Sequence, residues 1–173
     1  MIAISDNDQK IIAFLIKNYA SRFTTREIGL KLKISPAGSY KSLKKMEKGG
    51  IVVAEKLGTG LFYDINLRKT SAFHLACFVA STDEKDVKEL SELTRLVLKH
   101  QNGILVVTGH HSLEQAKAAA AKIFKEDKLG VMSDDEFVSG ILSRDNHISG
   151  MIQSGTILFG SEFLIKALQR RAR

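Results

Sequence analysis

The sequence lacks the features that mark secreted and membrane proteins. It has a single cysteine, so no internal disulfide can form, and no apolar run approaches the roughly 20 residues that cross a bilayer. Residues 1–15 contain no basic stretch followed by an apolar one, so we expect no secretory signal. Cys77 lies in an apolar stretch, which is typical of a small core residue in a reducing compartment. These absences predict a cytoplasmic protein.

Motifs for a bound metal are also missing. No cysteine or carboxylate falls at the spacing of a zinc finger or of an H-E-x-x-H helix. His110 and His111 are adjacent, and together with His100 or His147 they offer the alternative of a metal site. We interpret the pair instead as part of an exposed loop, and we predict no cofactor.

Positive charge is present, and it is confined to one part of the chain. The 173 residues include 26 lysines and arginines against 19 acids, a net charge of +7. Residues 1–70 hold 13 of the basic residues and only 6 of the acids, so the remaining residues carry no net charge. A basic excess restricted to one segment indicates a polyanionic partner such as duplex DNA, the alternative being lysines that only keep the surface soluble.

A helix followed directly by a hairpin is predicted in this basic segment. Ser35 is a favourable N-cap, and Pro36 suits the first helical position because its missing N–H is not needed there. Gly49 and Gly50 end the helix. Strands at 51–55 and 61–65 follow, joined by a glycine-rich loop at 56–60. The loop glycines allow either close approach to a phosphate or simply a tight turn.

Two further helices are predicted before this one. Residues 5–20 have apolar side chains at helical spacing and acids in the first turn. A short strand at 22–23 is expected to pair with the hairpin, and a second helix to run from Thr24 or Thr25 to about Leu32. The side chains expected in the core are Ile11, Ile12, Phe14, Leu15, Tyr19, Ile28, Leu32, Ile34, Leu43 and Met46.

This order of elements resembles the winged helix-turn-helix DNA-binding domain of MarR-like and archaeal regulators. Residues 35–52, SPAGSYKSLKKMEKGGIV, carry the resemblance best, because helix, stop and strand follow one another with no spare residues. The resemblance covers residues 1–68 and implies an α+β winged helix that binds DNA. It also implies that the helix beginning at Pro36 lies in the major groove.

The residues expected to contact DNA fall into two kinds. Lysines neutralise phosphates, while the small residues and Tyr40 near the start of the helix approach the bases, although Tyr40 is also interpretable as a domain contact. The helix has no Arg, Asn or Gln, so we expect modest sequence specificity, or specificity from dimer spacing and DNA shape. The expected DNA-binding residues are Arg22, Thr25, Arg26, Ser35, Ala37, Gly38, Tyr40, Lys41, Lys44, Lys45, Lys56, Gly58 and Thr59.

Residues 69–173 predict a small α/β domain. Thr70–Ala80 is apolar almost all round and is expected to be buried against this domain or another subunit, with His74 as a core histidine. A helix is predicted from Ser81 to about His100, with Val87, Leu90, Leu93, Leu96 and Val97 on its apolar face. Later strands are predicted at 104–107, 129–132 and 156–159, and helices at 112–124, from 133, at 145–154 and from 161. This alternation favours some parallel pairing.

The second half also resembles the end of a minimal nucleotidyltransferase, the kind found fused to winged helices in archaea. The matching pieces are LGVMSDDEFVSGIL, HISGMIQSGTILFG and SEFLIKAL, within residues 83–168. That family implies a Gly-Ser pair after a first strand and aspartates that bind Mg²⁺. Here Thr108-Gly109 follows the strand, no strand carries Asp-x-Asp, and Asp134-Asp135 opens a helix. We therefore predict a domain without catalysis that serves dimerisation or ligand sensing.

A candidate anion site lies where the first of these later strands ends. It comprises Gly109, His110, His111 and Ser112, since a glycine ahead of a helix N-terminus presents backbone N–H groups to an anion. The sequence as a whole predicts a DNA-binding transcriptional regulator whose second domain either pairs subunits into a homodimer or senses a small-molecule effector. The alternatives are a nucleotidyltransferase-related enzyme and a protein-interaction module that uses the winged helix.

Overall fold

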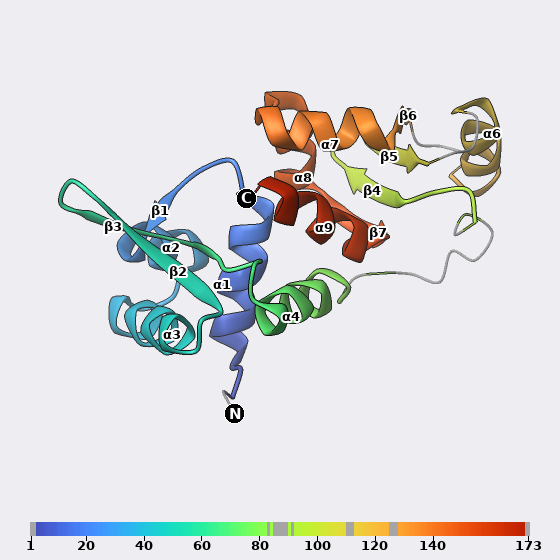
Figure 1. Ribbon diagram of the computed structural model, residues 1–173. Helices are drawn as coiled ribbons and strands as arrows, with labels where there is room; N and C mark the ends of the chain where they lie inside the picture. Colours follow the sequence, from blue (N-terminus) through green and yellow to red (C-terminus); the bar gives the residue numbers. More distant parts are fainter. Residues whose placement is uncertain are drawn as a thin grey trace. The chain divides into compact units, whose positions relative to one another are not determined.

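The computed structural model describes residues 3–82, 84, 90, 92–109, 113–124 and 128–171 (Figure 1). The chain divides into two compact units, one ending at Val79 and the other beginning at Ala80. The first unit is a winged helix and the second is a small α/β domain. The predicted boundary at residue 68 lies one helix too early, because α4 (Thr70–Ala80) groups with the first unit.

Three capped helices form the body of the first unit. They are α1 (Asp6–Lys17), α2 (Thr25–Leu32) and α3 (Pro36–Lys48). Ser5 and Thr24 each form a capping box with an acid three residues later. After α3, Gly50 takes φ +68°, and the N–H of Ile51 donates to the carbonyl of Met46 at 2.8 Å, which ends the helix as predicted.

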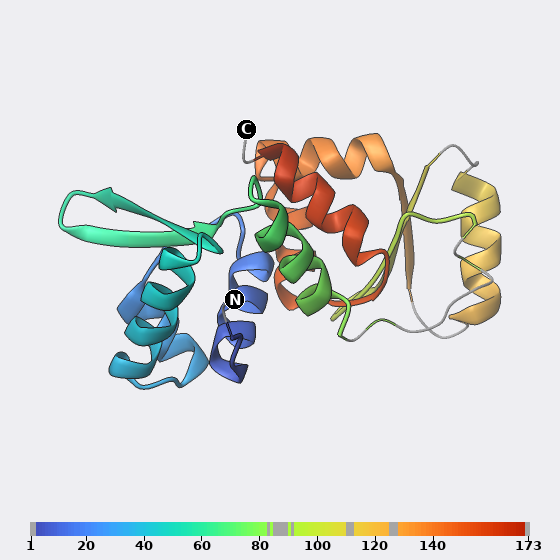
Figure 2. The same cartoon turned by 60° about the horizontal axis from the view of Figure 1, so that its bottom comes forward.

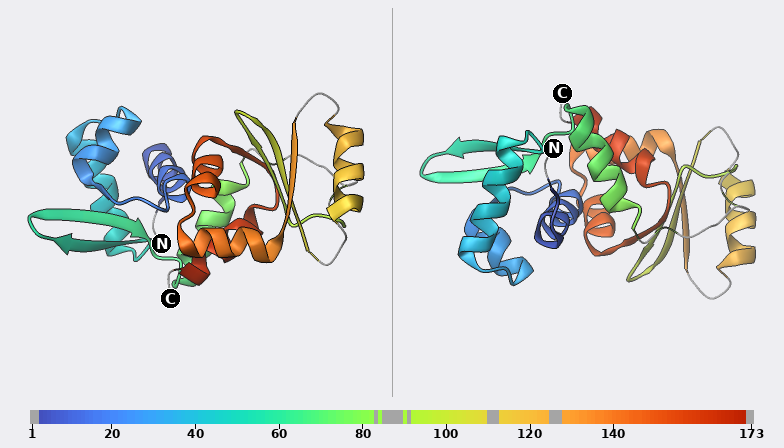
Figure 3. Two further views of the ribbon diagram at one scale, coloured as in Figure 1. Left: turned by 90° about the horizontal axis from the view of Figure 1, so that it is seen from above. Right: turned by 90° about the horizontal axis from the view of Figure 1, so that it is seen from below.

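A three-stranded sheet completes the winged helix. Its strands are β1 (Phe23–Thr24), β2 (Val52–Leu57) and β3 (Gly60–Ile65), in the antiparallel order β1-β3-β2. Leu57 pairs with Gly60, so the hairpin turn has two residues rather than the five predicted. Gly58 has φ +59° at the first turn position, where tight hairpins use glycine. The hairpin packs against α1, α2 and α3 (Figure 3).

The core of the first unit contains most of the predicted side chains. Those that are only half-buried are Phe14, Leu32 and Ile34. The buried ones that confirm the prediction are Ile11, Ile12, Leu15, Tyr19, Ile28, Leu43 and Met46, joined by Ile16. Because these residues come from all three helices, their burial fixes the packing that presents α3.

The helix α4 departs from its prediction. Ala72, Ala76 and Val79 are buried, but Phe78 is 62% exposed and His74 is also exposed. The prediction of a core histidine is wrong, since His74 instead packs edge-on against the neighbouring ring of Phe73, with 5.4 Å between centroids. Neither α4 nor any other helix in the described part of the chain is long and apolar enough to cross a bilayer.

The second unit is built on a mixed four-stranded sheet. Its strands are β4 (Leu96–His100), β5 (Gly103–Thr108), β6 (Leu129–Ser133) and β7 (Thr156–Phe159), in the order β6-β5-β4-β7. Only the β5–β6 pair is parallel. The predicted helix to about His100 is therefore wrong at its end, where β4 pairs with both neighbours. Val87, on its predicted apolar face, lies outside the described residues.

Helices cover both faces of this sheet. In Figure 2, α6 (Leu113–Ile123) lies on one face, and α7 (Asp134–Ser143), α8 (Asn146–Ser154) and α9 (Ser161–Arg171) lie on the other. Double coverage explains why β5 is buried along its whole length. A core cluster joins β4, β5, β7 and α6 through Leu90, Val97, Ile104, Val106, Ala116, Ala120 and Leu158.

Candidate nucleic-acid interface

The helix α3 is held against α2 by two small residues. A side chain at Gly29 would begin 2.9 Å from the hydroxyl oxygen of Ser39, so the glycine permits a close approach of the two helices. Ser39 is buried and donates its hydroxyl to the carbonyl of Pro36 at 3.1 Å. The hydroxyl oxygen of Ser35 accepts the N–H of Gly38 at 3.1 Å and is committed to capping the helix.

The outward face of α3 is polar and basic. Ala37, Tyr40 and Lys41 are exposed, and Tyr40 retains 56% of its accessible surface. Gly38, expected on this face, is only half-buried, with Ile34 and the Ser35 hydroxyl close to it. Among the residues that the structure describes, Lys41 has no ion-pair partner, so its ammonium group is available to an external anion.

Lys44 is also on this face, but an acid of the same helix holds it. Its ammonium donates to Glu47 Oε2 at 2.8 Å. That hydrogen bond, which outweighs desolvation, raises the pKa of Lys44 above its ordinary value. The lysine therefore stays charged, yet a phosphate would have to compete with the carboxylate for it.

Lys45, predicted as a phosphate contact, keeps 37% of its side-chain surface exposed, but an acid of α1 already holds its ammonium group. Its ammonium is paired with Asp8 Oδ2 of α1 and donates to the carbonyl of Ala3 at 3.0 Å. The Asp8 side chain is fully buried. Burial alone would raise the pKa of Asp8, but hydrogen bonds from Lys45 and Ser5 outweigh it and lower the pKa below its ordinary value. Lys45 therefore has a structural partner inside the domain.

The predicted residues before α3 have mixed surroundings. Arg26, at the start of α2, is exposed and, among the described residues, has no ion-pair partner. Thr25 is half-buried next to it. Arg22 is paired with Glu55 of β2, 2.8 Å from guanidinium nitrogen to carboxylate oxygen, and both side chains are about half-exposed. Arg26 is therefore the freer of the two predicted arginines.

The hairpin tip presents Lys56, Gly58 and Thr59 to solvent, as the prediction requires. It also presents Leu57, which is 42% exposed. A second exposed leucine, Leu30, keeps 70% of its surface on α2. Leu30 was not among the predicted residues, although its spacing of four residues from Arg26 places the two on one stripe of that helix.

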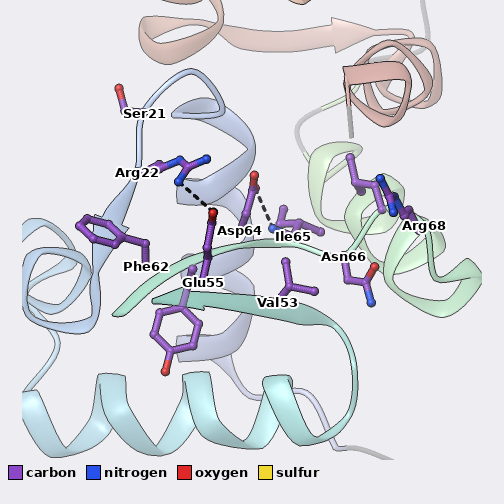
Figure 4. Close-up of a pocket in the computed structure, with 11 residues that line it drawn as sticks. Ser21, Arg22, Val53, Glu55, Phe62, Asp64, Ile65, Asn66 and Arg68 are labelled. Carbon is purple, nitrogen blue, oxygen red and sulfur yellow. Dashed lines mark hydrogen bonds and ion pairs between the residues drawn. The ribbon is translucent and has the colours of Figure 1, made fainter. Parts of the chain in front are cut away.

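The other face of the hairpin sheet has balanced charge. A cavity of about 310 Å³ lies there, lined by Ser21, Arg22, Val53, Glu55, Phe62, Tyr63, Asp64, Ile65, Asn66, Leu67 and Arg68. Figure 4 shows the Arg22–Glu55 ion pair across it and Asp64 accepting the N–H of Ile65. Two arginines and two acids line this cavity, in contrast to the basic face of α3.

The candidate anion site of the second unit is described only at its first residue. Gly109 is half-buried, and the guanidinium of Arg95 lies against it. A Cβ added at Gly109 would lie 2.8 Å from Arg95 Nε. His110, His111 and Ser112 lie outside the described residues, so the site stays a prediction. Across the described ranges, no three His, Cys, Asp or Glu side chains come together as a metal site would require.

Comparisons with known proteins add little to this geometry. The sequence matches no described protein family and no curated protein. One solved structure, that of a mutant of ZitR from Lactococcus lactis, matches over 70% of this chain and 72% of its own, with 18% identity and a TM-score of 0.40. A likeness at that score says nothing about what this chain binds.

Proposed function

We propose that the protein binds duplex DNA through α3 and the hairpin and acts as a transcriptional regulator. The observation that carries this proposal is the free ammonium of Lys41 beside Ala37 and Tyr40 on the outward face of α3, among the described residues. Arg26 and Lys56 supply further exposed cations in the same unit. The basic excess lies entirely in this unit, and phosphate neutralisation by such cations drives DNA binding.

Replacing Lys41 with alanine tests the proposal at one side chain. Each phosphate that a lysine neutralises adds about 0.9 to the slope of log affinity against log salt, so Lys41→Ala lowers that slope by about 0.9 and weakens binding at low salt. Fluorescence anisotropy with a labelled duplex measures both quantities. Lys122→Ala, on the exposed surface of α6, is the matched control and leaves both unchanged. A Lys41 variant with the wild-type slope would contradict the proposed contact.

Removing the acid that pairs with Lys44 should change DNA affinity in the opposite direction to Lys41→Ala. In Glu47→Gln the ammonium of Lys44 loses its carboxylate partner, and the DNA face loses a negative charge. We expect tighter binding and a salt slope that is steeper by up to about 0.9, because Lys44 becomes free to neutralise a phosphate. The same anisotropy titration measures it. Weaker binding by this variant would show that Lys44 does not face the duplex.

A protein-docking role for the same face has one observation in its favour. Leu30 and Tyr40 are unusually exposed for large side chains, which is typical of contact surfaces. The salt dependence separates the two functions, since an apolar protein contact weakens little as salt rises, whereas DNA binding weakens steeply. Binding to a partner protein that survives charge reversal at Lys41, Lys44 and Lys45 and does not weaken with salt would favour docking.

We further propose that the second unit is not catalytic and serves subunit pairing or effector sensing. Asp134 is half-buried at the start of α7 and accepts the N–H of Asp135 at 2.9 Å, as acids at a helix start commonly do. A regulator that pairs into a homodimer matches the two-fold symmetry of an operator. Light scattering with and without duplex tests the pairing, and a strictly monomeric particle in both would contradict it.

A further inference from the structure

Lys41 and Lys45 should face the same way, and they do not. They are four residues apart, so both lie on one stripe of α3. Lys41 is exposed, whereas the ammonium of Lys45 turns toward α1 and meets a carboxylate 37 residues earlier in the chain. The same ammonium donates to the carbonyl of Ala3 at 3.0 Å. The second lysine of the stripe is therefore used within the protein.

The partner of Lys45 is itself fixed by the start of α1. Oδ2 of Asp8 accepts the N–H of Ser5 at 2.7 Å and its hydroxyl at 2.8 Å, and this oxygen also receives Lys45. A single buried carboxylate oxygen therefore joins the N-cap of α1 to the second half of α3. Since the side chain of Asp8 has no exposed surface, it cannot shift partners to solvent without opening the domain.

The two halves of α3 are thus held by different contacts. Ser39 against Gly29 holds the first half to α2, and Lys45 with Asp8 holds the second half to α1. If the second contact is lost, buried Leu43 and Met46 still hold α3 in the core, but its second half is fixed less tightly. Binding to DNA must then order the helix, which costs affinity, while the number of phosphates neutralised stays the same.

From this arrangement we propose that Asp8 and Lys45 are positioning residues for DNA binding, which orient α3 without touching the duplex. The inference rests on the proposed function and refines it. It assigns the N-terminal segment of α1 a role in DNA affinity, although that segment is not part of the basic face. Of the three predicted lysines of α3, it leaves Lys41 as the one not held by an acid, since Glu47 holds Lys44 and Asp8 holds Lys45.

The test compares variants that remove charge with little change of shape. Lys45→Met alone leaves a buried carboxylate unpaired and risks unfolding, so the central variant is the double replacement Asp8→Asn with Lys45→Met, which leaves no buried charge. Lys41→Met is the control for a direct phosphate contact, and Lys48→Met is the control for an exposed lysine of the same helix. Each folded variant is titrated with a fluorescent duplex of random sequence over a range of salt concentrations.

The positioning role predicts a specific combination of results. The double variant binds about tenfold more weakly at each salt concentration, within the range of coupling between packed neighbours, while its salt slope equals that of the wild type. Lys45→Arg, which retains the ion pair, keeps wild-type affinity. Lys41→Met loses about 0.9 of slope, and Lys48→Met differs from the double variant by keeping wild-type affinity.

Three outcomes would overturn the inference. A double variant whose slope falls by about 0.9 would make Lys45 a direct phosphate contact. A folded double variant with wild-type affinity and slope would make the ion pair purely structural, with the proposed function intact as long as Lys41→Met weakens binding. A wild-type protein that does not bind the duplex would overturn the proposed function and this inference together.

Discussion

Gly160→Ala is expected to destabilise the second unit by about 3 to 5 kcal/mol. Gly160 follows β7 with φ +84°, a conformation that L side chains rarely adopt. An added Cβ would overlap the carbonyl oxygen of Arg95 and lie 2.9 Å from Cα of Leu96. Both are backbone atoms at the start of β4, so the strand itself would have to move. Urea unfolding followed by circular dichroism measures the loss.

Gly150→Ala is the matched control for this substitution. Gly150 lies inside α8, and an added Cβ would meet no atom within 4 Å. Alanine there removes chain entropy from the unfolded state and favours the helix, so we expect a stabilisation of about 0.5 to 1 kcal/mol. A Gly160→Ala protein as stable as the wild type would show that β7 does not end against Arg95 as described.

Lys45→Met is expected to destabilise the first unit by about 3 kcal/mol at neutral pH. The substitution leaves the buried carboxylate of Asp8 without its cation, and an unpaired buried charge is far more costly than an exposed one. Tyr19, Tyr40 and Tyr63 all lie in this unit and there is no tryptophan, so tyrosine fluorescence follows its unfolding in urea. The control is again Lys48→Met.

The penalty for Lys45→Met should depend on pH in a direction set by Asp8. The lowered pKa of Asp8 means that its ion pair stabilises the wild type above the ordinary pKa of an aspartate, and that this stability disappears as pH falls through the lowered pKa. The variant and the wild type should therefore converge in stability in acid. Asp8→Asn in the Lys45→Met background should recover stability at neutral pH, and a pH-independent difference would contradict the ion pair.

Local signals in the sequence were sufficient for much of the fold. The cap at Ser35 and the stop at Gly49-Gly50 were predicted, because capping depends on residues within one turn. The strand Thr156–Phe159 was predicted residue for residue. The hairpin was placed correctly, although its turn is shorter than the glycines suggested.

The errors occurred where distant segments decide the outcome. Leu96 and Val97 continue the helical spacing of Leu90 and Leu93, and only pairing with β5 and β7 makes them a strand. Lys41 and Lys45 are both lysines on one stripe of α3. Their roles differ only because the buried carboxylate of Asp8, on α1, pairs with Lys45. The Ser-x-x-Asp pattern that begins at Ser5 predicts the start of α1. Nothing in that pattern shows that Asp8 also pairs with Lys45.

The most direct measurement of the central claim is the affinity of the wild-type protein for a random-sequence duplex across a series of salt concentrations. If α3 lies against the phosphate backbone, log affinity falls linearly and steeply with log salt, and Lys41→Ala lowers the slope by about 0.9. The absence of binding at low salt, or a binding curve that salt does not change, would contradict DNA binding by this face.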